Sequence, residues 1–105
     1  MSREAANAAF RAGSYAEAAS LYTTCIKYTE KELETVADAA RRSQLTEEQA
    51  TLFTNRATAR FHTNELDACI ADCNSALELD HGRVKALFRR AQVCGWLLVA
   101  DFLYV

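Results

Sequence analysis

The sequence predicts an all-α fold built as a solenoid of helical hairpins. The chain has 105 residues, no proline and three glycines, so few residues break helices. Apolar residues recur three and four positions apart, which is the spacing of one face of a helix. The triplet Asn55-Arg56-Ala57 returns as Arg89-Arg90-Ala91. This shift of 34 residues is typical of helical repeat proteins.

Size and charge predict one domain and exclude several classes of partner. A chain of this length can bury a core of its own. The net charge of −2 gives no support for binding to nucleic acid or to an anionic membrane. The strongly apolar run at 96–100 is too short to span a bilayer. The polar start predicts no secretory leader, and four cysteines without a CxxC motif predict reduced thiols in a cytoplasmic protein.

The first hairpin is expected between Ser2 and about residue 40. Ser2 can cap the first helix, and Gly13 can end it. Ser14 and Glu17 form a capping box for the second helix, which is expected to run to about residue 40 before a short loop. The apolar faces at helical spacing are Ala5, Ala6, Ala9 and Phe10, then Ala18, Leu21, Tyr22, Cys25 and Ile26.

The second hairpin is expected at about 47–79. Thr46 and Gln49 form a capping box for a third helix over about 47–62. Asn64 is the N-cap candidate of a fourth helix over about 65–79, with Asp67 at the third helical position. The predicted buried residues are Leu52, Phe53, Ala57 and Phe61, then Leu66, Cys69, Ile70, Cys73, Ala76 and Leu77.

A fifth helix is expected from about Arg83, after the turn His81-Gly82. Its predicted buried residues are Val84, Leu87, Phe88 and Ala91.

The last ten residues form an apolar tail with one charge, Asp101. Either the fifth helix continues through Gly95 to about residue 103, or a short sixth helix folds back. Both alternatives leave apolar surface without a partner in the chain, and such patches mark interfaces. Self-association is therefore one hypothesis, and a truncated or alternatively spliced product is another. The self-association candidates are Trp96, Leu97, Leu98, Phe102 and Tyr104.

Aligned on their hairpins, three segments of the chain correspond. Ala6, Ala57 and Ala91 are equivalent, as are Phe10 and Phe61, and Gly13 and Asn64. With small residues at helix contacts and bulky ones between them, the chain resembles the tetratricopeptide repeat (TPR) family. The resemblance implies a single domain of about two and a half repeats, with five helices and an apolar C-terminal helical extension. Its parts are repeat 1 at about 2–29, an insertion at 30–46, repeat 2 at 47–80, a partial repeat 3 at 81–95 and the tail at 96–105.

Five polar residues are predicted to form a binding site. In a TPR stack the first helices of successive repeats line a groove. Arg3 and Asn7 share one face of the first of these helices, and Lys85 and Arg89 share one face of the third. Asn55 is the equivalent of Arg89 on the helix between them. Cations and amide donors in this arrangement suit two adjacent carboxylates, such as those of a chain-terminal Asp.

The set resembles the dicarboxylate clamp of co-chaperone TPR domains. Those domains bind the C-terminal Glu-Glu-Val-Asp tail of heat-shock chaperones of the 70 and 90 kDa classes. By position the clamp falls on Arg3, where Lys is usual, and on Asn7, Asn55, Lys85 and Arg89. Additional candidate groove contacts are Phe10, Arg56 and Arg60. The resemblance implies a co-chaperone adaptor, and the alternative is a TPR scaffold for another peptide or for self-association through the tail.

Simpler interpretations stand beside these. Arg and Lys on helices are commonly solvated surface residues. Cys69 and Cys73, with His62 and His81 nearby in sequence, suggest zinc, but both cysteines occupy packing positions and are expected to be buried thiols. No segment resembles a nucleophile with its base or a phosphate loop. We therefore expect no enzyme activity, no metal and no cofactor; a targeting fragment of a larger enzyme is the third functional class considered.

Overall fold

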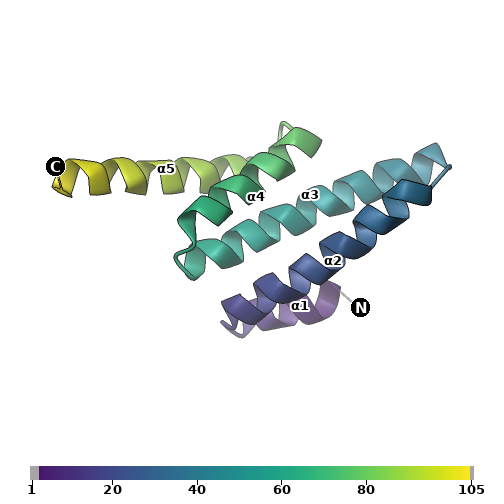
Figure 1. Cartoon of the computed structure of the whole chain (residues 1–105), viewed down its shortest axis with the longest axis horizontal. Helices are drawn as coiled ribbons and strands as arrows, with labels where there is room; N and C mark the ends of the chain where they lie inside the picture. Colours follow the sequence, from purple (N-terminus) through teal and green to yellow (C-terminus); the bar gives the residue numbers. More distant parts are fainter. Residues whose placement is uncertain (1–2, 105) are drawn as a thin grey trace.

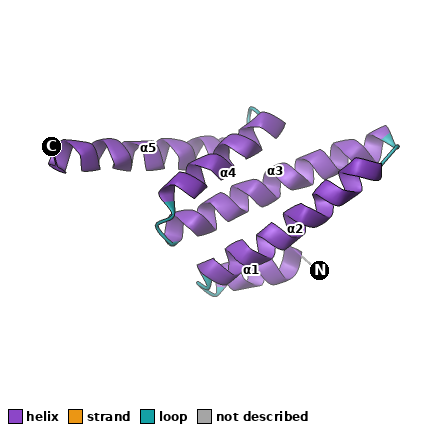
Figure 2. Ribbon diagram, viewed as in Figure 1, coloured by secondary structure: helices purple, strands orange, loops and turns teal. Residues whose placement is uncertain are grey.

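The computed structural model describes the backbone of residues 3–104 and the side chains of residues 3–95. This part of the chain is helical throughout, apart from short turns (Figure 2). The helices are α1 (Arg3–Arg11), α2 (Tyr15–Thr35), α3 (Ala39–His62), α4 (Leu66–Leu79) and α5 (Val84–Tyr104). They pack in adjacent pairs as a TPR-like solenoid (Figure 1). The all-α prediction is confirmed.

Two short turns join the helices of the hairpins through a residue with positive φ. Gly13 has φ +82° and Asn64 has φ 65°, and these are the positions that the repeat alignment made equivalent. A positive φ ends a helix because it turns the next amides back onto the last carbonyls. Asn64 therefore ends α3, and its predicted role as N-cap of α4 is wrong. The N-cap of α4 is Glu65.

The capping box predicted before α2 is also wrong. Ser14 is the N-cap residue, but its side chain makes no capping hydrogen bond. Its φ of −85° and ψ of 68° lie outside the β region that an N-cap normally adopts.

The segment predicted as an insertion, 30–46, continues two helices, and the short loop expected after about residue 40 lies at 36–38. α2 ends at Thr35, before the expected residue 40, and α3 begins at Ala39, well before the expected residue 47. Asp38 caps α3, accepting a hydrogen bond of 3.2 Å from the Arg41 amide. Thr46 does not cap a helix: its hydroxyl donates to the carbonyl of Arg42, one turn back. A threonine inside a helix commonly makes this bond.

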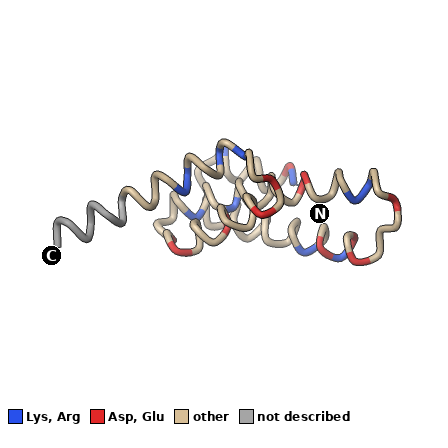
Figure 3. The backbone as a smooth tube through the Cα atoms, turned by 90° about the horizontal axis from the view of Figure 1, so that it is seen from above, with Lys and Arg blue, Asp and Glu red and all other residues tan. Residues whose placement is uncertain are grey.

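Charged residues hold the far end of this long hairpin together. Arg41 binds both oxygens of Glu32 across the two helices at 2.7 and 3.0 Å. Arg42 Nη2 donates to the carbonyls of Leu33 and Val36, which stabilises the C-terminal end of α2. Both signs of charge are interspersed along this end of the molecule (Figure 3).

The core is built from small side chains, which lets neighbouring helices approach closely. Ala6, Ala18, Ala57, Cys69 and Cys73 are each 0% exposed. Larger residues fill the space between them, namely Tyr22, Leu45, Leu52 and Val93. None of the helices in the described part is both long enough and apolar enough to cross a membrane.

α5 is one continuous helix to Tyr104, so the first alternative for the tail is the one observed. Its predicted buried face is wrong: Val84, Leu87 and Phe88 are 73%, 40% and 63% exposed, and Ala91 is exposed as well. The buried residues are instead Ala86 and Val93, because α5 packs on α3 and α4 with its opposite side. The self-association candidates Trp96, Leu97, Leu98, Phe102 and Tyr104 have side chains outside the described ones.

Candidate functional site

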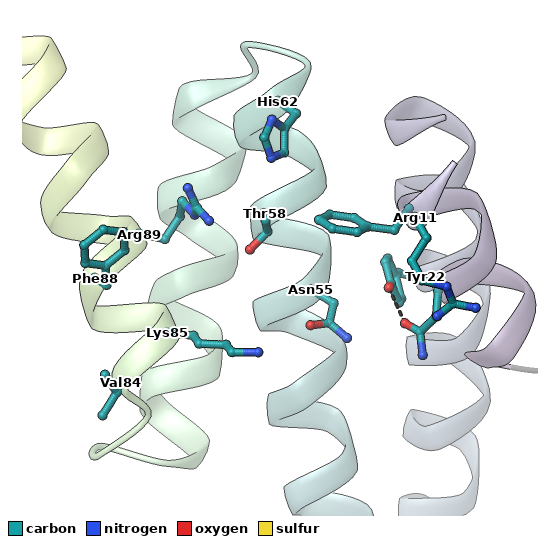
Figure 4. Close-up of a pocket in the computed structure, with 11 residues that line it drawn as sticks. Arg11, Tyr22, Asn55, Thr58, His62, Val84, Lys85, Phe88 and Arg89 are labelled. Carbon is teal, nitrogen blue, oxygen red and sulfur yellow. Dashed lines mark hydrogen bonds between the residues drawn. The ribbon is translucent and has the colours of Figure 1, made fainter. Parts of the chain in front are cut away.

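A cavity of about 610 Å³ lies among α1, α3 and α5, and α2 contributes Tyr22 to its wall. Four of the five predicted site residues line it: Asn7 from α1, Asn55 from α3, and Lys85 and Arg89 from α5. In Figure 4, Lys85 and Arg89 extend from α5 toward α3, where Asn55 lies between α5 and α1. The structure therefore brings together residues more than 80 positions apart.

The fifth predicted residue, Arg3, lines an adjoining cavity of about 540 Å³. Asn7 and Asn55 line both cavities, so Arg3 continues the same surface one helical turn away from Asn7. The rest of this second cavity comes from the early part of α3, including Glu47 and Glu48. Arg3 thus lies at the acidic end of the groove.

Tyr22 fixes the orientation of Asn7. Its hydroxyl donates a hydrogen bond to Asn7 Oδ1 (Figure 4, dashed). With its oxygen engaged, the Asn7 amide has its NH₂ group available as a donor to a ligand. Tyr22 is 1% exposed, and burial raises the pKa of its hydroxyl, which keeps the proton on the donor. The sequence identified Tyr22 only as a core residue.

Arg89 is held by its neighbours before any ligand binds. Its Nη1 donates to Gln92 Oε1 at 2.7 Å. Its guanidinium carbon lies 4.6 Å from the centre of the Phe61 ring and 6.0 Å from that of Phe88, within cation–π range. A guanidinium fixed in this way loses little side-chain entropy when it binds a carboxylate.

The lining of the larger cavity is positively charged. Arg11, Lys85 and Arg89 contribute three cations, and no Asp or Glu of the described chain lines this cavity. Neither Lys85 nor Arg89 forms an ion pair with any other described residue. The cavity can therefore accept an anionic ligand without breaking an existing ion pair.

Aromatic rings close one end of the groove. His62 stacks on Tyr15 with ring centres 4.2 Å apart, and the edge of Phe10 completes the group at 6.1 Å from His62. Phe10 and His62 line the larger cavity, so the candidate contact Phe10 lies where the sequence placed it. The opposite rim carries Val84 and Phe88, which Figure 4 shows on the side of α5 away from α3. An apolar ligand side chain would find surface at either position.

The other two candidate contacts, Arg56 and Arg60, lie elsewhere. Arg56 binds both oxygens of Asp72 on α4 at 2.9 and 2.7 Å, and Arg60 binds one of them at 2.9 Å. Arg56 also donates to Thr23 on α2. Neither arginine lines the larger cavity. One residue along a helix turns a side chain by about 100°, which carries Arg56 away from the groove that Asn55 faces.

The cysteines that suggested zinc are packed inside the protein. Cys69 and Cys73 are both 0% exposed, as expected for buried thiols, whereas His62 and His81 are exposed. Among the described residues no three His, Cys, Asp or Glu side chains form a group that could hold a metal ion. A hydrogen bond with Cys73 lowers the pKa of the Cys69 thiol, so the two thiols interact with each other.

Comparison with known proteins found similarity to parts of larger chains. The sequence is 37% identical over 89 residues to mitochondrial import receptor subunit TOM34 of Homo sapiens, covering 85% of this chain and 26% of that protein. It is 36% identical over 85 residues to human sperm-associated antigen 1, covering 81% and 8%. It is 33% identical over 90 residues to human DnaJ homolog subfamily C member 7, covering 86% and 16%. No protein-family model matches the chain.

The chain thus spans about a quarter or less of the length of these relatives. The similarity extends over more than four fifths of this chain. It supports a TPR domain and a role in protein–protein interaction.

Proposed function

We propose that this chain is a co-chaperone adaptor module that binds the acidic C-terminal tail of heat-shock chaperones of the 70 or 90 kDa class. The observation that carries the proposal is the larger cavity, where two amides and the cations Lys85 and Arg89 converge and no acidic residue of the described chain lies. The comparisons support the general class, because these relatives are of the TPR co-chaperone type. The proposed location is the cytoplasm.

The chemistry of the groove suits a terminal Asp, which carries two carboxylates close together. Asn7 and Asn55 offer neutral amide donors, and Lys85 and Arg89 offer charged ones. Bonds from charged donors to a carboxylate are shorter and about twice as strong as neutral ones. Arg3 extends the donor row at the next turn of α1, where its planar fork replaces the point charge of the usual Lys.

Apolar contacts would complete the recognition of such a tail. The aromatic end formed by Phe10 and His62 and the rim formed by Val84 and Phe88 flank the charged region. The Val of a Glu-Glu-Val-Asp tail, and a Met before it, could bury their side chains there. Binding through these charged and apolar contacts should have modest affinity. The affinity should fall as the salt concentration rises, because the charged contacts are close to solvent.

A calorimetric titration tests the proposal. The ligand is Met-Glu-Glu-Val-Asp, with its C-terminus free or amidated, and the proteins are the wild type, Lys85→Ala and the control Lys31→Ala. Lys31 is an exposed residue of α2 outside the larger cavity. A lost charge-assisted bond costs about 1.5–3 kcal/mol, so amidation and Lys85→Ala should each weaken binding roughly 10- to 150-fold. The control should bind like the wild type.

Equal binding in every combination would exclude a carboxylate clamp. A second outcome is that the free and amidated peptides both bind weakly while a different peptide binds tightly in the same groove. That outcome would support the alternative of a TPR scaffold for another ligand.

A further inference from the structure

His62 lies in the candidate groove, and the five predicted clamp residues make no use of its chemistry. It lines the larger cavity, is exposed to solvent and takes part in none of the ion pairs of the described residues. Its ring stacks on Tyr15 at 4.2 Å, with an angle of 15° between the two planes. Stacking uses the face of the imidazole, whereas its two nitrogens lie at the edge of the ring. The ring is therefore held in place while its edge can still bind a ligand.

His62 stands at one end of a row of side chains along α3. Asn55, Thr58 and His62 are three and four residues apart and follow one another along the helix (Figure 4). In the other direction from Asn55, the same spacing leads to Thr51 and Glu48, which line the adjoining cavity. One end of the row is thus a histidine and the other end is a glutamate.

The charges along this row give an acidic ligand one preferred direction. The larger cavity holds three cations and no acidic residue of the described chain, whereas the adjoining cavity holds Glu47 and Glu48 with the cation Arg3. Consider a ligand whose terminal carboxylates lie at Asn55. Its preceding acidic residues are repelled if they run toward Glu48, because like charges face each other there. They are attracted if they run toward His62.

The reach of an extended peptide identifies the ligand residue that arrives at His62. Asn55 and His62 are seven positions apart, which is about 10 Å along the helix axis. An extended peptide advances about 3.3 Å per residue, so it covers this distance in about three residues. In a Glu-Glu-Val-Asp tail, the residue three positions before the terminal Asp is the first glutamate.

We propose that protonated His62 binds the first glutamate of this tail, so that capture of the tail takes up a proton. This proposal rests on the proposed function, because it concerns the same groove and the same ligand. Histidine is the side chain whose charge ordinarily changes between pH 5 and 8, and a neighbouring carboxylate favours its charged form. Binding should therefore strengthen as the pH falls from 7.5 to 6.0.

The surroundings of His62 bring no other group that changes its charge in this range. The titratable groups around the cavity are Arg11 from α1, Tyr15 and Tyr22 from α2, and Lys85 and Arg89 from α5. Lysine and arginine remain positive, and tyrosine remains neutral, between pH 6.0 and 7.5. Glu65, in the turn after α3, accepts a hydrogen bond from the Thr63 hydroxyl. His62 is the last residue of α3, where the partial negative charge of the helix end favours a cation.

Titration calorimetry at pH 6.0 and 7.5 tests the coupling. The ligand is Met-Glu-Glu-Val-Asp with an acetylated N-terminus, because acetylation removes the one group of the peptide that titrates in this range. The wild type should bind it at least about threefold more tightly at pH 6.0 than at pH 7.5. The ratio of the two affinities is compared because a change at His62 also alters the aromatic end of the groove.

Two variants assign the pH dependence to one histidine. His62→Gln cannot gain a proton and should bring the ratio of affinities close to one. The control His81→Gln removes the other histidine of the chain, which lies in the turn before α5 and outside the larger cavity. This control should keep the ratio of the wild type.

Two further acetylated peptides test which glutamate His62 binds. Met-Gln-Glu-Val-Asp lacks the first carboxylate and should bind the wild type equally well at both pH values. Met-Glu-Gln-Val-Asp lacks the second carboxylate and should keep the ratio of the unsubstituted peptide. The reverse result would overturn the assignment to the first glutamate.

The outcomes separate this proposal from the proposed function. Tail binding with equal affinity at both pH values, or an unchanged ratio in His62→Gln, overturns this proposal and leaves capture of the tail standing. Absence of binding at both pH values overturns the proposed function and this proposal with it.

Discussion

Tyr22→Phe should weaken the binding of a carboxylate tail although Tyr22 lies behind the groove. The substitution removes one hydroxyl and leaves the ring in its cluster with Ala6, Ala18 and Ile26. What is lost is the hydrogen bond to Asn7 Oδ1. A typical hydrogen bond contributes about 1 kcal/mol to stability, so the free energy of unfolding should fall by about that amount.

The loss in affinity follows from the freedom that Asn7 gains. Its amide no longer has its oxygen fixed, so the ligand must immobilise the side chain itself. Ordering one side chain on binding costs about 0.5–1.5 kcal/mol, which corresponds to roughly 2- to 12-fold weaker binding. Titration calorimetry with the Met-Glu-Glu-Val-Asp peptide measures this, and urea unfolding measures the stability of the same variant.

Two controls make the result interpretable. Tyr28→Phe removes a hydroxyl from a side chain that is 62% exposed on α2 and should change neither quantity. Asn7→Ala removes the proposed donor itself and should weaken binding more than Tyr22→Phe does. If Asn7→Ala weakens binding while Tyr22→Phe binds like the wild type, Tyr22 does not position Asn7 and the reasoning is refuted.

Three further outcomes are expected. Arg89→Lys keeps the charge but loses the planar fork of the guanidinium. The tail should therefore bind roughly tenfold more weakly, which corresponds to the loss of about one charge-assisted hydrogen bond. An unchanged affinity in titration calorimetry would contradict this. Asp72→Asn leaves Arg56 and Arg60 without their carboxylate at a site where Asp72 is 3% exposed. The free energy of unfolding, measured with urea, should therefore fall by about 3 kcal/mol. A fall of less than about 1 kcal/mol would argue against a structural ion pair. Burial raises the pKa of the Tyr22 hydroxyl above its ordinary 10.0. The unfolded chain therefore ionises first, and stability is complete below pH 10 and declines above it. Urea unfolding from pH 9 to 11 should show a shallower decline for Tyr22→Phe, and identical slopes would contradict the burial of that hydroxyl.

Much of the fold could be predicted because local patterns and packing agree. Small residues at Ala6, Ala18, Ala57 and Cys69 recur at helix spacing, and the structure buries each of them completely. The alignment of Gly13 with Asn64 paired two residues that share a positive φ, although Asn64 was expected to cap the fourth helix. These features lie within single helices or turns, where sequence neighbours are also neighbours in space.

The start of α3 could not be predicted from a capping motif. Thr46 and Gln49 match the sequence pattern of a capping box. The same threonine hydroxyl can instead donate a hydrogen bond to a carbonyl one turn back, as it does to the carbonyl of Arg42. The residues before it are good helix formers, and nothing interrupts the helix until Asp38. A local motif therefore indicates where a helix can begin, not that it does.

The prediction that the outward face of α5 (Val84, Leu87 and Phe88) is buried was wrong for a different reason. Periodicity shows which side chains would gain from burial, but it does not show whether a helix is present to cover them. The hydrogen bond between Tyr22 and Asn7 was missed because it joins two helices, through residues 15 positions apart in the sequence. Helical periodicity indicates that a side chain is buried, but it does not indicate which polar group its hydroxyl contacts. The five candidate binding residues were predicted from their spacing on the helices and from the resemblance to a clamp, and four of the five line one cavity.

One competition measurement tests the central claim that the groove captures a terminal carboxylate pair. The two peptides are Met-Glu-Glu-Val-Asp and the same sequence with one glycine added at its C-terminus. Both carry the same net charge, but the added residue moves the α-carboxylate away from the Asp side chain. The account predicts that the extended peptide competes at least about tenfold more weakly, by the loss of one charge-assisted bond. Equal competition by the two peptides would contradict it, because the groove would then respond to acidity alone.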